Sequence, residues 1–206
     1  GKAADADGVI VGVTDAAKGA ADVLNVVVSG AAAVDAGTVA AASVETINIT
    51  STNSGLTPGI AHLLEISDAA VTTMTAAGTA GLNLTLNANV VALTSLDATA
   101  MTGALTASTN GTVAQTILGG AGADVLTAAG TSDILNGGAG NDTLIAGNLA
   151  QLTGGDGTDT FNMTALTTNV NSYASILDAS SGDIIKANAG AFKSGQITLA
   201  PTAVFQ

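Results

Sequence analysis

Short stretches of alternating apolar and polar residues dominate the first half of the chain. Residues 82–87, Leu-Asn-Leu-Thr-Leu-Asn, show the pattern most clearly, with an apolar residue at every second position. Because the side chains of a strand point alternately to its two faces, this pattern predicts a strand with one buried face. Gly, Asn, Asp and Ser separate these stretches, as turns require. The strands expected on this basis are 23–28, 44–50, 63–66, 71–75, 82–86, 90–96 and 104–107.

One segment of this half has a different composition. Residues 31–42 are rich in Ala, which favours a helix, although Gly37 interrupts the segment. We therefore expect one short helix over 31–42, within an otherwise irregular, Ala/Thr-rich β region that ends near residue 109.

Residues 110–162 contain a nonapeptide that recurs in register. Three copies fit G-G-x-G-x-D-x-U-x, where U is a large apolar residue: GGAGADVLT at 119–127, GGAGNDTLI at 137–145 and GGDGTDTFN at 154–162. The glycines permit a tight turn with positive φ, and the residues after the Asp suffice only for a very short strand. The U residues, which are expected to face a thin core, are Leu126, Leu144 and Phe161.

The spacing of the three Asp residues predicts how the copies stack. Asp124 and Asp142 are separated by the length of two nonapeptides, and the step from Asp142 to Asp159 is one residue shorter. If each nonapeptide makes one turn and one strand, two copies complete a coil, and alternate copies lie on the same side. One side then carries these three Asp residues. The other side carries the matching position of the degenerate copies, which is Gln115, Asp133 and Gln151.

The pattern as a whole predicts an all-β fold. We expect an Ala/Thr-rich β region over 1–109, a parallel β-solenoid or β-roll over 110–162, and a C-terminal β segment over 163–206 that completes or caps the roll. This last segment contains ILDASSGDII at 176–185. Its Asp178 and Asp183 either cap a loop, the interpretation that we favour, or ligate a metal.

The Gly-rich turns bring carboxylate and carbonyl oxygens together, and such oxygens suit a hard cation such as Ca²⁺. We expect one ion between the turns of 119–124 and 137–142, and a second between those of 137–142 and 154–159. Each ion takes two Asp side chains together with backbone carbonyls. The residues assigned to these sites are Gly119, Gly120, Ala121, Gly122, Asp124, Gly137, Gly138, Ala139, Gly140, Asp142, Gly154, Gly155, Asp156, Gly157 and Asp159.

The opposite side of the coil is poorer in charge. Gln115 and Gln151 supply no carboxylate, but their amides both donate and accept, so a neutral ladder can replace metal there. Asp133 is one more candidate ligand on this side. Its alternative role, equally weighted, is a solvated turn residue.

The charge balance agrees with a cationic partner. Lys and Arg together number 4 against 16 acidic residues, which gives a formal net charge of −12. Acidic surfaces repel nucleic acid and anionic lipid, so neither is expected as a partner, and folding is expected to depend on bound cations. The chain has no Cys for disulfides and no apolar run long enough to cross a bilayer.

Other candidate residues have weaker support. His62, the only His, has no partner for a zinc site or a catalytic set, so we expect a structural histidine and no enzyme activity. Asp97 lies two nonapeptide lengths before Gln115, which we interpret as chance. At the N-terminus, solvated turns are favoured over a calcium site, whose candidate residues are Asp5, Asp7, Asp15, Asp22 and Asp35.

The three good copies resemble the RTX, or hemolysin-type, calcium-binding repeats of proteins exported by type I secretion. That resemblance implies a β-roll in which the sixth-position Asp and turn carbonyls hold Ca²⁺. Residues 22–26, 44–49 and 93–108 resemble bacterial surface-layer (S-layer) proteins of the Caulobacter and Campylobacter type. Together they imply a secreted, calcium-dependent structural protein of the cell surface that self-associates in a lattice. An RTX adhesin segment, or the non-catalytic export domain of a type I-secreted protein, is the alternative.

Overall fold

The computed structural model describes residues 8–14, 22–41, 43–55, 59–111, 113–166, 173–187 and 197–199. Within these ranges every regular element is a strand, and no helix is long and apolar enough to span a membrane. The strands are β1 Gly8–Thr14, β2 Val23–Gly30, β3 Asp35–Ala40, β4 Thr46–Asn53, β5 Ala61–Ser67, β6 Thr73–Gly78, β7 Gly81–Leu86, β8 Ser95–Met101, β9 Leu105–Ser108, β10 Thr116–Leu118, β11 Val125–Thr127, β12 Ile134–Ala139, β13 Thr143–Ile145, β14 Gln151–Asp156, β15 Thr160–Asn162, β16 Ala174–Ile176, β17 Ile184–Lys186 and β18 Ile197–Leu199.

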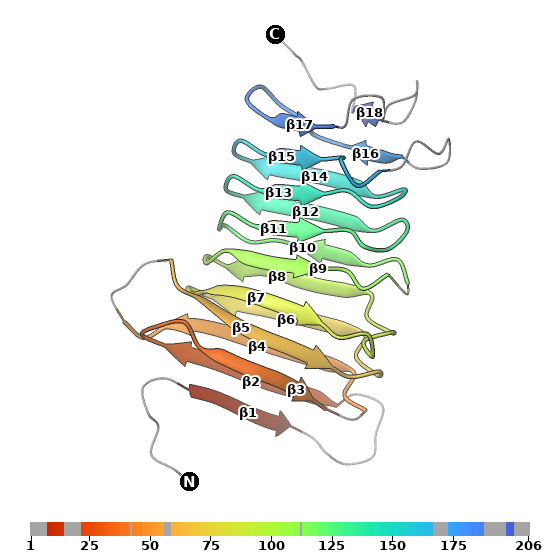
Figure 1. Ribbon diagram of the computed structural model, residues 1–206. Helices are drawn as coiled ribbons and strands as arrows, with labels where there is room; N and C mark the ends of the chain where they lie inside the picture. Colours follow the sequence, from red (N-terminus) through yellow and green to blue (C-terminus); the bar gives the residue numbers. More distant parts are fainter. Residues whose placement is uncertain are drawn as a thin grey trace.

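The strands form two sheets that face each other across one core. The larger sheet has the order β1-β2-β4-β6-β8-β10-β12-β14-β16-β18, and the smaller has the order β17-β15-β13-β11-β9-β7-β5-β3. From β2 onward the chain crosses from one sheet to the other at each turn, which builds the stack of coils in Figure 1. Neighbouring strands are parallel, except that β1 runs antiparallel to β2 and covers that edge. The all-β parallel β-solenoid predicted from the repeats is therefore confirmed.

The coils become smaller toward the repeats. Val23 pairs with Thr46 in the first coils, whereas Thr116 pairs with Ile134 in the repeats, which is a shorter step along the chain. The strands shorten from eight residues in β2 to three in β10. Both sheets run without a break across residues 109 and 110, because β8 pairs with β10 and β9 with β11. A domain boundary between residues 109 and 110 stays a prediction. The feature that changes near these residues is the size of the coils.

The core follows from the alternation of buried positions. In β2 every second side chain is buried, and in the three-residue repeat strands only the central one is. Burying one such large side chain contributes about 1.5–3 kcal/mol. The U residues Leu126, Leu144 and Phe161 are all 0% exposed, as predicted. The repeat coils therefore have a core one large residue wide on each sheet.

Two expectations about local structure are wrong. The helix expected over 31–42 is replaced by the edge strand β3, in which Gly37 has a φ of 63° and Thr38 and Val39 are β-branched. Parallel pairing with β5 outweighs the helix propensity of the Ala residues there. The strand expected over 90–96 begins only at Ser95, because Val90 and Leu93 are buried in the turn before β8.

Candidate metal centre

The three repeat Asp residues lie one above another just before β11, β13 and β15. The pairings of Val125 with Thr143 and of Thr143 with Thr160 put them at the same position of successive coils. Asp142 Oδ1 accepts a hydrogen bond from the Asp124 amide at 2.8 Å, and Asp159 Oδ1 accepts one from the Asp142 amide at 2.9 Å. Each of the three is 1% exposed. The predicted stacking on one side is confirmed, and we call this set the carboxylate column.

The carboxylate column has a defined beginning and end. At its start, Asp124 Oδ1 accepts from the Leu105 amide at 2.7 Å, and Leu105 occupies the Asp position of the preceding coil. At its other end, Asp183 Oδ1 accepts from the Asp159 amide at 2.8 Å. The column therefore begins on an apolar residue and continues past the third repeat to a fourth carboxylate.

The second oxygens of these carboxylates differ from copy to copy. Asp124 Oδ2 accepts from the Gly120 amide at 2.8 Å, whereas the Oδ2 atoms of Asp142 and Asp159 are buried without a hydrogen-bond partner. In the third copy the equivalent turn amide, that of Gly155, donates to Asp178 Oδ2 at 2.8 Å and not to Asp159. In the larger sheet, β12 and β14 also extend into their turns and pair Gly138 with Gly155. β10 stops at Leu118, which leaves the Gly120 amide available.

The buried carboxylates are electrostatically strained in the absence of a cation. Burial is the main cause that raises the pKa of Asp142 from 3.8 to about 7; the Asp124 amide hydrogen bond opposes this rise, and the charges of Asp124 and Asp159 contribute to it. Burial likewise raises the pKa of Asp159, with the Asp142 amide opposing it and the charges of Asp183 and Asp178 adding to it. Burial also raises the pKa of Asp124, against its amide hydrogen bonds from Leu105 and Gly120.

The first glycine of each copy makes room for the carboxylate of the same copy. A Cβ on Gly137 would collide with Asp142 Oδ2 and would lie 2.6 Å from the Gly154 carbonyl oxygen. The unpartnered oxygen of Asp142 and this carbonyl therefore border the same small space. A Cβ on Gly154 would collide with Asp159 Oδ2 in the same way.

The donor set fits calcium. In the described part of the chain no three His, Asp or Glu side chains converge as a metal cluster, so carbonyls must complete any site. Calcium accepts six to eight oxygens and takes backbone carbonyls readily. Unpartnered buried carboxylate oxygens, a carbonyl beside one of them and glycines that leave space meet that need. Asp142, Asp159 and the Gly154 carbonyl are the ligands best placed between the second and third good copies.

The first good copy differs from the other two. Its Asp124 already has hydrogen bonds on both oxygens. The turns of the second and third copies use glycines at positive φ, which are Gly138, Gly140, Gly155 and Gly157, whereas Gly120 and Gly122 are not among the positive-φ glycines of the described residues. An ion between 119–124 and 137–142 stays a prediction.

On the opposite side, Asp133 is a buried structural residue. It is 0% exposed, so the alternative of a solvated turn residue is wrong. Its Oδ1 accepts from the Gln115 amide at 2.9 Å. Its Oδ2 accepts from the Thr109 hydroxyl at 2.7 Å and from the Gly130 amide at 2.8 Å. These bonds stabilise the turn without a cation, and metal ligation by Asp133 stays a prediction.

The neutral ladder of amides expected on this side is wrong. Ile134 pairs with Gln151, so Ala150 occupies the Asp position and Gln151 is exposed. The Gln115 side chain instead donates to the Leu93 carbonyl at 3.0 Å and to Asn110 Oδ1 at 2.8 Å. The copy at 146–153 is one residue short, and the missing residue lies before its strand. Ala150 lies two positions before the buried Leu152, just as Asp133 lies two positions before the buried Leu135.

The described residues include some of the remaining acidic candidates. Asp178 accepts from the Gly154 and Gly155 amides at 2.8 Å each, so its capping role is confirmed. Asp97 lies within β8 and pairs with Leu118, so its spacing from Gln115 is indeed chance. Among the N-terminal candidates, Asp35 is exposed and accepts from the Gly37 amide, and the Asp22 amide donates to Glu45. Asp5, Asp7 and Asp15 lie outside the described residues.

His62 is a core residue of β5. It is 0% exposed, its Nδ1 accepts from the Val34 amide at 3.0 Å, and its Nε2 lies 3.0 Å from the Thr52 carbonyl oxygen, to which it donates. Both ring nitrogens are therefore used to connect strand β5 with neighbouring backbone.

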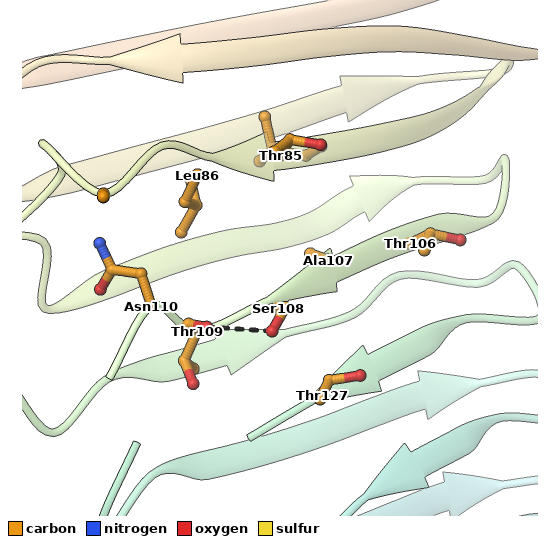
Figure 2. Close-up of a pocket in the computed structure, with 10 residues that line it drawn as sticks. Thr85, Leu86, Thr106, Ala107, Ser108, Thr109, Asn110 and Thr127 are labelled. Carbon is orange, nitrogen blue, oxygen red and sulfur yellow. Dashed lines mark hydrogen bonds between the residues drawn. The ribbon is translucent and has the colours of Figure 1, made fainter. Parts of the chain in front are cut away.

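One hollow on the described surface offers no ionisable group. It lies on the smaller sheet over β7, β9 and β11 and has a volume of about 480 Å³ (Figure 2). Thr85, Thr106, Ser108 and Thr127 contribute hydroxyls, and none of its ten lining residues is acidic, basic or a thiol. The candidate site therefore lies at the Gly-Asp turns.

The fold and these turns define a parallel β-solenoid whose glycine-rich turns enclose buried Asp residues. Residues 111–147 match the family model of the RTX calcium-binding nonapeptide repeat (4 copies). The matched span holds the good copies at 119–127 and 137–145 and the degenerate nonapeptides beside them. The chain thus contains RTX repeats, which bind Ca²⁺ as a structural ligand and occur in proteins that are generally secreted, typically by type I secretion. No curated protein matches the chain.

Proposed function

We propose that this chain is a calcium-dependent structural protein of the bacterial cell surface, either a surface-layer subunit or a segment of one. The observation that carries the proposal is the carboxylate column, which has two unpartnered buried oxygens within one continuous two-sheet core. The resemblance of residues 22–26, 44–49 and 93–108 to S-layer proteins supports the finer assignment. The proposed role is non-catalytic.

Calcium acts in this proposal as the last component of the fold. Without it, Asp142 and Asp159 place uncompensated charge in a buried turn, which weakens the C-terminal coils. Extracellular modules typically bind calcium at about 10⁻⁴–10⁻³ M, far above cytosolic levels. The repeats therefore remain unfolded and exportable inside the cell and become ordered outside it.

The upstream coils supply the mechanical part of the proposed role. On the outer face of the larger sheet, the Thr46 and Thr73 hydroxyls are 3.2 Å apart. The Thr75 hydroxyl donates to Asn48 Oδ1 at 2.8 Å, and Asn48 Nδ2 donates to Asn25 Oδ1 at 3.0 Å. Because each such bond joins two coils, the stack is stiffened along its length, which suits a component of a surface lattice.

The test is circular dichroism during calcium titration with EGTA reversal, paired with electron microscopy of the calcium-loaded protein. We expect a reversible gain of β signal and extended two-dimensional sheets. The control Asp97→Asn, which removes one charge outside the turns, should behave like wild type. No spectral change with calcium would remove the calcium-dependent role. A spectral change without sheets would favour the adhesin segment or the export domain.

A further inference from the structure

The segment DASSGDIIK at 178–186 is a fourth turn of the carboxylate column. Leu152 pairs with Ile176, so Asp178, two residues further along, stands opposite Gly154. Thr160 pairs with Ile184, so Asp183 stands opposite Asp159. The five-residue step from Asp178 to Asp183 equals the step from the first glycine to the Asp of each good copy. Ile185 packs against the core where the other copies have their U residue.

This turn differs from the other three because Asp178 replaces the first glycine. Its two carboxylate oxygens accept from the Gly154 and Gly155 amides at 2.8 Å each. Asp159 Oδ2, buried and without a partner, lies beside the same Gly154. Two carboxylates therefore approach one glycine from two coils. A carboxylate oxygen has two lone pairs, so one that accepts an amide hydrogen bond still has a lone pair for a cation.

We propose that a Ca²⁺ ion binds between the turns of 154–159 and 178–183, with Asp159 and Asp178 as ligands together with turn carbonyls. Asp183 positions Asp159 through the hydrogen bond to its amide. This inference rests on the calcium role proposed above and lies outside residues 111–147, which match the repeat family. The two unpartnered oxygens then mark two successive sites, one at each end of the third copy.

The position of the unpartnered oxygens supports this assignment. Asp142 Oδ2 borders the Gly154 carbonyl, which places one site between the second and third copies. Asp159 Oδ2 is the equivalent atom one coil further, where Asp178 stands in place of a glycine. The charges of Asp183 and Asp178 both reach Asp159, so three carboxylates act around one turn. A divalent cation offsets that repulsion.

The experiment counts bound calcium on the full chain by native mass spectrometry, with affinities from isothermal titration of CaCl₂. Asp178→Asn keeps one acceptor for the Gly154 amide and removes the charge, and it should bind one ion fewer than wild type. Asp97→Asn should keep the wild-type count. Asp142→Asn should lose the ion between 137–142 and 154–159, and the double variant Asp142→Asn with Asp178→Asn should lose this ion together with the one between 154–159 and 178–183.

A second variant guards against misfolding. Asp183→Asn keeps an oxygen that accepts from the Asp159 amide, and because it removes the charge of a residue that positions a ligand it should weaken the same ion about tenfold. If Asp178→Asn loses every ion together with its β signal, the substitution has unfolded the chain, and the calcium affinity of Asp183→Asn then tests the proposal. Wild-type counts and affinities in both variants would overturn the proposal, even where Asp142→Asn still loses an ion. No calcium bound by wild type would instead refute the calcium role itself.

Discussion

Replacing Asp142 by Asn should have opposite effects on stability without and with calcium. Asn keeps an oxygen that accepts from the Asp124 amide, so the hydrogen bond at 2.8 Å survives. It removes the charge on the buried, unpartnered oxygen. Without calcium that charge only destabilises the folded chain, whereas with calcium it is a ligand. The substitution should therefore stabilise the apo form and weaken the response to calcium.

The size of the apo effect follows from the pKa of Asp142. Burial raises it from 3.8 to about 7, so the folded state binds a proton more tightly than the unfolded state. The carboxyl therefore supports folding below about pH 4, and this support is lost as the pH rises to about 7. The difference corresponds to at most about 4 kcal/mol. Relaxation of the protein around the buried charge lowers this to about 2 kcal/mol.

The assay is thermal unfolding at pH 8 in EGTA and in millimolar CaCl₂. For a chain of this size, about 2 kcal/mol raises the midpoint by about 4–8 °C, so Asp142→Asn should exceed wild type by that amount in EGTA. Calcium at 100 times its Kd stabilises wild type by about 2.7 kcal/mol. The variant should lose the gain from the ion between 137–142 and 154–159, which exceeds its advantage in EGTA, so the order of the midpoints reverses. A variant less stable than wild type in EGTA, or one with an undiminished calcium gain, would refute the reasoning.

Three further predictions concern the same column and the coil upstream. Gly154→Ala should abolish the calcium response, because its Cβ would collide with Asp159. The control Gly37→Ala should keep the response and lower the free energy of unfolding by only about 1 kcal/mol, because of its φ of 63°. Calcium titration followed by circular dichroism compares the two variants. His62→Ala leaves the Val34 amide and Thr52 carbonyl unpaired, so urea unfolding should show a loss of about 2–4 kcal/mol at an unchanged calcium count. In EGTA the wild-type midpoint should fall between about pH 4 and pH 7, and in saturating CaCl₂ it should rise, because calcium needs the ionised carboxylates.

Periodicity made most of the fold predictable from the sequence. A coil of two nonapeptides with one large apolar residue per strand admits few arrangements, and Leu126, Leu144 and Phe161 are all buried as expected. Propensity alone did less well. The Ala-rich segment that contains Gly37 is strand β3, because pairing with β5 stabilises it and no helical packing partner exists in the described residues. The prediction of a strand at Val90 is wrong because a residue buried in a turn leaves no periodic pattern that distinguishes it from a strand residue.

The candidate site was predictable at the level of position and not of hydrogen bonding. Spacing placed Asp124, Asp142 and Asp159 in one column, but it treated them as equivalent. Their difference arises from the turn amides, because β10 ends at Leu118 and leaves the Gly120 amide to Asp124, whereas the Gly155 amide donates to Asp178 and not to Asp159. The role of Asp178 was left open for a related reason. A copy that begins with Asp instead of Gly fails a motif defined by glycines, although its register is intact.

Calcium dependence should be confined to the C-terminal coils, because the carboxylate column begins at Leu105. Upstream, strands such as β2 have eight residues and bury several apolar side chains, so these coils have their own core. A repeat strand of three residues buries only one side chain. That burial offsets little of the conformational entropy lost when the nonapeptide becomes ordered and of the cost of the buried charge in its turn. Hydrogen exchange in EGTA should therefore show protection from β2 to β9 and its loss from β11 to β17, with calcium restoring the second group. Simultaneous loss in both groups would show that the upstream coils also require the ions.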